Sequence, residues 1–235
     1  MLPYFYHKEL NTTQQQFVLN EETSKHCVQV LRMQNGEKLQ LTNGLGLLCT
    51  VEIIEANKRN TIVRIIEKSE VKSQNQKVII AISLLKNASR FEWFLEKASE
   101  IGVTEIIPLI SKRTERQSFK FDRLNNIVVA AMLQSQQAFL PILHQPIYYN
   151  DLFTNKLINQ STNKLIAHCL EENKTPITKV ENSDDVIILI GPEGDFTPEE
   201  IEIALQNNFK PVTLGNTRLR TETAGIVAAT LLVNK

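Results

Sequence analysis

The chain has 235 residues, of which 42% are hydrophobic and 22% are charged, so its composition excludes an intrinsically disordered protein. Its 26 lysines and arginines balance its 26 aspartates and glutamates, so the net charge is zero. This excludes binding to nucleic acid that depends on overall positive charge. The three cysteines form no Cys-x-x-Cys pair, so we expect neither a disulfide framework nor a structural zinc site.

The start of the chain contains no sustained apolar stretch like the core of a signal peptide, which predicts a cytoplasmic location. The longest apolar runs, 78–82 and 186–190, are far shorter than the roughly 20 residues that span a bilayer. We therefore expect no membrane segment.

Residues 1–71 are dominated by short β-type runs that alternate with turn signals such as Asn43-Gly44. Three runs are expected to form strands: 38–42, 47–54 and 61–67. A short helix is predicted between Ser24 and Leu31, with Thr23 or Ser24 as its N-cap. This pattern predicts a small β-barrel or sandwich, and the polar segment 72–77 is the expected linker.

Residues 78–235 alternate short apolar runs with amphipathic stretches, which predicts an α/β domain. Five parallel strands are expected, at 78–83, 105–109, 165–168, 186–190 and 212–214. Helices are expected from Ser89 to Gly102, near 122–131, at 175–180, from Thr197 and at 222–233. Ser89 with Glu92, and Thr197 with Glu200, have the spacing of capping boxes. The last helix is so apolar all round that we expect it to be buried, by packing against another subunit or by threading between loops. A closing helix of one core is the alternative.

Ligands bind parallel sheets at the carboxyl ends of their strands, where two loops of this chain stand out. Gly191-Pro192-Glu193-Gly194-Asp195 follows the strand at 186–190, and 214–225 carries Arg220 and Glu222 before the last helix. A plain strand-to-helix turn is the alternative for the first loop. Neither loop contains a dinucleotide-binding or P-loop motif, and no His-Glu-x-x-His or Gly-x-Ser-x-Gly motif occurs. We predict no metal site, because the four histidines are isolated.

Five motifs together resemble those of the ribosomal RNA small subunit methyltransferase E family, which belongs to the SPOUT (α/β-knot) methyltransferases. They are His26–Arg32 with Asn35-Gly36-Glu37, Leu85-Lys86, Glu96–Val103, Leu189–Gly194, and Leu214-Gly215 with Leu219–Ala224. The last two, in this order and at this spacing, are the specific part of the resemblance, which extends over nearly the whole chain.

The resemblance implies a C-terminal α/β-knot domain at 78–235, with a mostly parallel sheet and a deep trefoil knot, after a PUA-like RNA-binding β-barrel at 1–71. It also implies S-adenosyl-L-methionine as the cofactor, a homodimer formed through the knot domain, and methylation of uridine N3 in 16S ribosomal RNA of the small ribosomal subunit. Methylation of tRNA or of a ribose 2′-hydroxyl is one alternative. Another is a non-catalytic RNA-binding protein of ribosome assembly.

The same resemblance places the cofactor on the following residues: Leu189, Ile190, Gly191, Pro192, Glu193, Gly194, Leu214, Gly215, Leu219, Arg220, Thr221, Thr223 and Ala224. Because uracil N3 carries a proton at neutral pH, we expect Arg220 and Glu222 to be catalytic. Glu222 is expected to accept a proton or to hold Arg220 in place, and a purely structural ion pair is the alternative.

Phosphate contacts with RNA are expected at exposed basic residues. The predicted set is Arg32, Lys38, Arg90, Lys112, Arg113 and Arg116. A solvated surface is the alternative for the basic loop at 112–123. The chain departs from the family pattern at Gln136, Gln137 and Asp195, and the last of these stands where a glycine is common.

Overall fold

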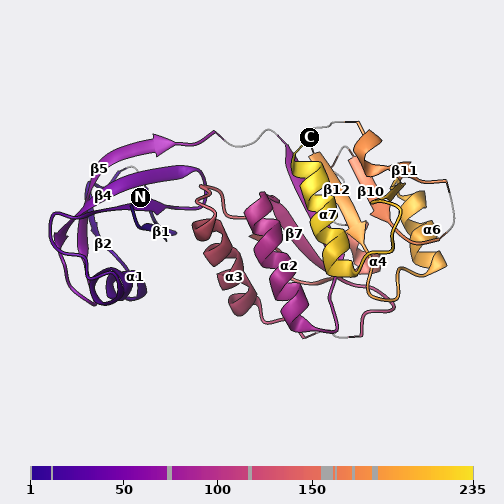
Figure 1. Cartoon of the computed structure of the whole chain (residues 1–235), viewed down its shortest axis with the longest axis horizontal. Helices are drawn as coiled ribbons and strands as arrows, with labels where there is room; N and C mark the ends of the chain where they lie inside the picture. Colours follow the sequence, from indigo (N-terminus) through magenta and orange to yellow (C-terminus); the bar gives the residue numbers. More distant parts are fainter. Residues whose placement is uncertain are drawn as a thin grey trace. The chain divides into compact units, whose positions relative to one another are not determined.

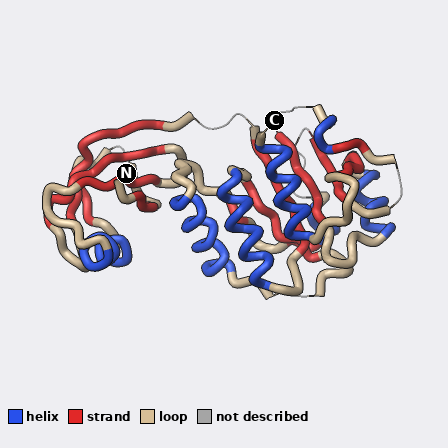
Figure 2. The backbone as a smooth tube through the Cα atoms, viewed as in Figure 1, coloured by secondary structure: helices blue, strands red, loops and turns tan. Residues whose placement is uncertain are grey.

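The computed structural model describes residues 2–11, 13–72, 76–115, 118–154, 161, 163–170, 173–181 and 185–234. The chain divides into two compact units, one built from 1–73 with 132–140 and the other from 74–131 with 141–235 (Figures 1 and 2). Of the expected linker, residues 73–75 lie outside the described part, and Lys77 already begins a strand of the second unit.

The first unit contains a five-stranded sheet that confirms the β-rich N-terminal module. Its order is β1 (Tyr4–Tyr6), β3 (Lys38–Thr42), β4 (Leu47–Glu55), β5 (Ile62–Glu70) and β2 (Gln16–Val18). The three predicted strands are β3, β4 and β5, which pair antiparallel. Strands β1 and β2 were not predicted, because three residues are too few to show an alternating pattern. Alternate residues such as Leu39, Leu41 and Val51 form the core.

The predicted helix at 24–31 begins earlier and is not uniform. Helix α1 spans Glu21–Lys25, and its N-cap is Asn20, whose side chain accepts a hydrogen bond from the Thr23 backbone at 2.8 Å. Thr23 and Ser24 lie inside the helix, so the prediction that one of them caps it is wrong. One turn of π-helix, His26–Val30, then continues the chain to Arg32, which has a φ of 57°.

The second unit is built on an eight-stranded sheet in which every pairing is parallel. The five predicted strands are confirmed as β6 (Lys77–Ser83), β7 (Glu105–Ile110), β10 (Asn163–Ala167), β12 (Asp185–Ile190) and β13 (Lys210–Thr213). Three further strands of two residues each are β8 (Ile142–Leu143), β9 (Ile147–Tyr148) and β11 (Thr175–Pro176). The helix expected at 175–180 is reduced to a 3₁₀ turn, Ile177–Lys179, after β11.

Helices cover both faces of this sheet, as a parallel sheet requires. They are α2 (Ala88–Ile101), α3 (Phe121–Gln134), α4 (Tyr149–Leu152), α6 (Pro198–Gln206) and α7 (Thr221–Val233). Alternate strand residues such as Ile79, Ala81 and Leu189 share a core cluster with residues of α4 and α6. Helices α2 and α7 lie side by side (Figure 1), and α7 packs against β6 and β12. Among the described residues, no helix has the length and apolar character needed to cross a membrane.

Local capping explains where the helices begin. Thr197 and Glu200 form the predicted capping box of α6. Helix α2 instead has Asn87 as its N-cap, whose side chain accepts a hydrogen bond from the Ser89 backbone at 2.9 Å, so the predicted Ser89–Glu92 box is wrong. Gly102 ends α2 as expected, with a φ of 102° that favours glycine.

Helix α7 is buried along one side only, whereas the sequence predicts burial all round. Gly225, Ala228, Ala229 and Leu232 are buried. Apolar residues on the rest of its surface, including Ile226, Val227 and Leu231, are only partly buried in this single chain.

Candidate cofactor and RNA site

A cavity of about 710 Å³ lies at the carboxyl ends of β10, β12 and β13. This is the edge at which parallel sheets bind ligands, and cavities of roughly 300–1,000 Å³ are typical of small-molecule sites. Both loops singled out in the sequence contribute to its wall. The structure therefore brings together residues of two segments that are separated along the chain by α6 and β13.

Most of the predicted cofactor residues line this cavity. They are Ile190, Gly191, Pro192, Glu193, Leu214, Gly215, Leu219, Arg220, Thr221 and Ala224. Leu189, Gly194 and Thr223 do not contribute to the lining. Leu189 is fully buried in the core cluster that includes α6, and the carbonyl oxygen of Gly194 accepts a hydrogen bond from the Arg113 side chain.

The loop after β10 supplies part of the wall that sequence reasoning missed. Ala167, His168, Cys169 and Lys174 line the cavity, and the Lys174 ammonium donates a hydrogen bond to the His168 carbonyl at 2.6 Å. The signal for this segment was present, since a strand was predicted there and its carboxyl end belongs to the ligand-binding edge. The segment contains no glycine, unlike the two loops that stand out in the sequence.

Asp195 joins two loops at the cavity. Its φ of 64° lies in the left-handed region, which glycine enters freely and aspartate tolerates. Its carboxylate accepts hydrogen bonds from the Phe196 backbone at 2.8 Å and from the Cys169 backbone at 2.7 Å. The aspartate thus adopts a conformation that also suits glycine, and its carboxylate links this loop to the loop after β10.

Two glycines shape the cavity in different ways. A Cβ on Gly191 would lie 3.1 Å from the Phe196 nitrogen and 3.3 Å from an Asp195 carboxylate oxygen, so this turn is tightly closed. Gly215 has a φ of 145° and nothing within 4 Å of an added Cβ, so its backbone faces open space. Bare backbone beside the apolar side chains of Leu214 and Leu219 suits a ligand with both polar and apolar parts, such as S-adenosylmethionine.

The two predicted catalytic residues occupy different positions. Arg220 is the exposed N-cap residue of α7 and lines the cavity. Glu222 is 6% exposed, and its Oε1 lies 3.6 Å from Nε of Arg90, which also lines the cavity. The other carboxylate oxygen of Glu222 has no hydrogen-bond partner among the described residues. The expectation that Glu222 holds Arg220 is therefore corrected: its ionic partner is Arg90.

The basic loop after β7 is hydrogen-bonded to the loop after β12 and to α6. Glu200 accepts a hydrogen bond from the Lys112 backbone at 2.8 Å, and Arg113 donates to the Gly194 carbonyl. Glu193 accepts a weaker bond, at 3.3 Å, from the Lys86 backbone in the loop after β6. The hydrogen bond of the Lys86 ammonium to Glu115, at 2.7 Å, raises the pKa of Lys86. Cationic side chains thus border the same edge of the sheet as the cavity.

The remaining predicted RNA contacts are in the first unit or outside the described residues. Arg32 and Lys38 are exposed residues of the first unit. Arg116 lies outside the described residues.

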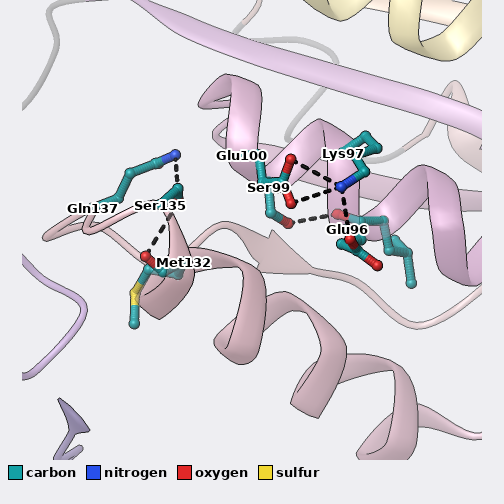
Figure 3. Close-up of polar contacts among 8 residues, drawn as sticks. Glu96, Lys97, Ser99, Glu100, Met132, Ser135 and Gln137 are labelled. Atoms are coloured by element: carbon teal, nitrogen blue, oxygen red, sulfur yellow. Dashed lines mark hydrogen bonds and ion pairs between the residues drawn. The ribbon is translucent and has the colours of Figure 1, made fainter. Parts of the chain in front are cut away.

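The departures at 136 and 137 lie in a turn that belongs to the first unit. Gln136 has a φ of 56°, and the Gln137 carbonyl accepts a hydrogen bond from the Tyr4 hydroxyl at 2.8 Å. The Gln137 amide donates to the Ser135 hydroxyl, which donates to the Met132 carbonyl (Figure 3). On α2, Lys97 contacts Glu96 and Glu100 (Figure 3). The Gln137 backbone therefore links this turn to β1 within the first unit.

Comparisons with known proteins show similarities to both parts of the chain. The RNA methyltransferase domain model matches residues 72–233, and the RNA methyltransferase PUA domain model matches 19–66. Ribosomal RNA small subunit methyltransferase E of Mesomycoplasma hyopneumoniae is 33% identical over 91% of this chain and 92% of its own length. A probable rRNA-methyltransferase from Porphyromonas gingivalis is 36% identical, covers 99% of both chains and superposes with a TM-score of 0.89.

A cofactor-bound structure is also similar. Ribosomal RNA small subunit methyltransferase E from Neisseria gonorrhoeae, solved bound to S-adenosyl methionine, is 28% identical with a TM-score of 0.86. The match covers 97% of this chain and 95% of that one.

Proposed function

This chain belongs to the ribosomal RNA small subunit methyltransferase E family, and from that premise we propose that it transfers a methyl group from S-adenosylmethionine to ribosomal RNA of the small subunit. We propose further that N3 of a uridine in 16S ribosomal RNA accepts the methyl group and that the reaction takes place in the cytoplasm. The observation that carries the proposal is the 710 Å³ cavity, which is lined by both family loops and by three arginines, Arg90, Arg218 and Arg220.

The residues of the cavity fit the cofactor. Backbone of the loops at 190–193 and 214–221 would hold its polar groups, and Ile190, Leu214 and Leu219 would pack on its adenosine. When bound, S-adenosylmethionine supplies an electrophilic methyl carbon, whose bond to sulfur breaks as the bond to the base nitrogen forms.

Arg220 and Arg90 supply the protein's part of the chemistry. Uracil N3 must pass its proton to solvent water to become a nucleophile, and the negative charge then spreads to the two neighbouring carbonyl oxygens. Guanidinium groups that donate hydrogen bonds to these oxygens stabilise the charge and so ease the loss of the proton. We assign Arg220 to contact with the reacting base. Glu222 orients Arg90 through their ion pair at 3.6 Å.

Replacing Glu222 by glutamine should lower kcat about tenfold while leaving the KM for cofactor within about twofold, because Arg90 would lose the charged partner that orients it. Steady-state kinetics on small subunits would measure both constants. The loss should not add to that of Arg90→Gln in the double variant. Fully additive losses would show that Glu222 does not act through Arg90.

RNA contacts are proposed on the cationic side chains at the cavity edge and in the first unit. Lys112 and Arg113 are held beside the cofactor loop, where they can bind phosphates next to the target nucleotide. Arg32 and Lys38 are exposed on the PUA-type unit and are proposed to bind more distant phosphates.

A homodimer through the knot domain is proposed from helix α7, together with the trefoil knot that the resemblance implies. The partly exposed apolar residues Ile226, Val227 and Leu231 would be covered by a second copy. Sedimentation equilibrium should therefore give twice the chain mass of 26.8 kDa. A mass of one chain throughout the micromolar range would contradict the dimer.

The function is tested by nucleoside analysis of 16S ribosomal RNA from cells that lack this protein. We expect one methyluridine to disappear, and we expect purified protein to restore it on isolated small subunits with labelled S-adenosylmethionine. Label that appears in tRNA or on a ribose would favour the rival methyltransferase activities. Unchanged RNA together with tight binding to the subunit would favour the assembly protein.

A further inference from the structure

A second, smaller cavity of about 180 Å³ lies beside the first turn of α2, in the same unit as the cofactor cavity. Its walls come from the loop after β6, from α2 and from the segment that leads into α3. Leu84, Leu85 and Phe91 form a floor that is at most 4% exposed. The volume is of the order of a single nucleobase.

The rim of this cavity is aromatic and cationic. Phe119 is partly exposed there, with its ring centroid 6.4 Å from that of Phe121. Lys120 and Arg123 are exposed at the rim, and Arg123 is held by an ion pair with Glu92 at 3.0 Å. An apolar slot with an aromatic edge and neighbouring cations is the arrangement that binds single-stranded RNA, because bases stack on the ring and phosphates pair with the cations.

The two cavities are neighbours through the first turn of α2. Ala88 and Ser89 line the smaller one, and the next residue, Arg90, lines the cofactor cavity. The N-terminus of α2 adds positive potential between them, and its backbone is capped by Asn87. A strand of RNA whose target base enters the larger cavity would therefore pass the mouth of the smaller one.

We propose that the cavity formed by Leu84, Leu85, Phe91 and Phe119 binds a nucleobase next to the methylated nucleotide. The proposal rests on the RNA methyltransferase function argued above. The occupant is inferred from the cationic rim and from the position of this cavity next to the larger one, since Ser89 lines the first and Arg90 the second.

The test uses a variant whose larger side chain fills the cavity mouth and which removes no contact that stabilises the fold. Ser89 is exposed at the mouth, and only its backbone serves the Asn87 cap, so Ser89→Leu should fold normally. The substrate is small subunits from cells that lack the protein. We expect the KM of Ser89→Leu for the subunit to rise about tenfold, with kcat and cofactor affinity within about twofold of wild type. Asn126→Leu, which adds the same side chain at an exposed position of α3 outside the cavity, should match wild type.

A second readout does not depend on turnover. Irradiation of the wild-type complex with small subunits at 254 nm, followed by mass spectrometry, should detect a nucleotide adduct on Phe119 that Ser89→Leu loses. A normal KM for Ser89→Leu together with no adduct at Phe119 in the wild type would overturn the proposal. If wild-type protein transfers no methyl group, the enzymatic function itself fails instead.

Discussion

Arg220→Ala should lower methyl transfer about 100- to 1,000-fold while the dissociation constant for S-adenosylmethionine changes less than about threefold. A loss of this size is typical when one preorganised donor to a developing negative charge is removed. The truncation should leave α7 intact, since the Arg220 side chain makes no capping hydrogen bond. Single-turnover transfer to small subunits, with calorimetry for cofactor binding, measures the two effects separately.

Two further variants separate the role of Arg220 from general charge. Arg220→Lys keeps the charge but lacks the planar fork of donors, so it should recover only part of the rate. Lys210→Ala removes a positive charge from an exposed position of the same unit outside the cavity and should transfer at the wild-type rate. Wild-type turnover in Arg220→Ala would remove Arg220 from the mechanism.

Gly225→Ala should destabilise the second unit by about 1–3 kcal/mol, although alanine normally stabilises a helix by about 1 kcal/mol over glycine. An added Cβ would lie 2.6 Å from Phe94 Cε2 and 3.0 Å from Ile82 Cδ1. Both side chains are fully buried, so neither can move aside without disturbing the packing of α2 and α7 on the sheet. Urea unfolding followed by far-ultraviolet circular dichroism gives the free energy.

A double variant tests whether a steric clash with Phe94 causes the loss of stability in Gly225→Ala. Phe94→Leu combined with Gly225→Ala should lose less stability than the sum of the two single variants, because the smaller side chain leaves room for the methyl group. Glu202→Ala, at an exposed position of α6 in the same unit, should change the free energy of unfolding by less than about 0.5 kcal/mol. A stabilised Gly225→Ala variant would show that α7 is not packed as closely as the structure places it.

Features that depend on nearby residues were predictable. The five apolar runs became parallel strands, and Thr197 with Glu200 became the cap of α6, because burial on both faces and capping act within a few residues. The cap of α2 was misplaced for a local reason, since Asn87 and Ser89 are both good capping residues and only the backbone geometry chose Asn87.

By itself the sequence determined the α/β class of the second unit, its main strands and helices, and the two loops that border the 710 Å³ cavity, because these follow from short-range patterns. Only the tertiary structure decided that Glu222 pairs with Arg90, that the loop after β10 completes the cavity and that α7 is buried on one side. These outcomes depend on which strands are neighbours in the sheet. Sheet order brings distant residues together, and no periodicity along the chain encodes it.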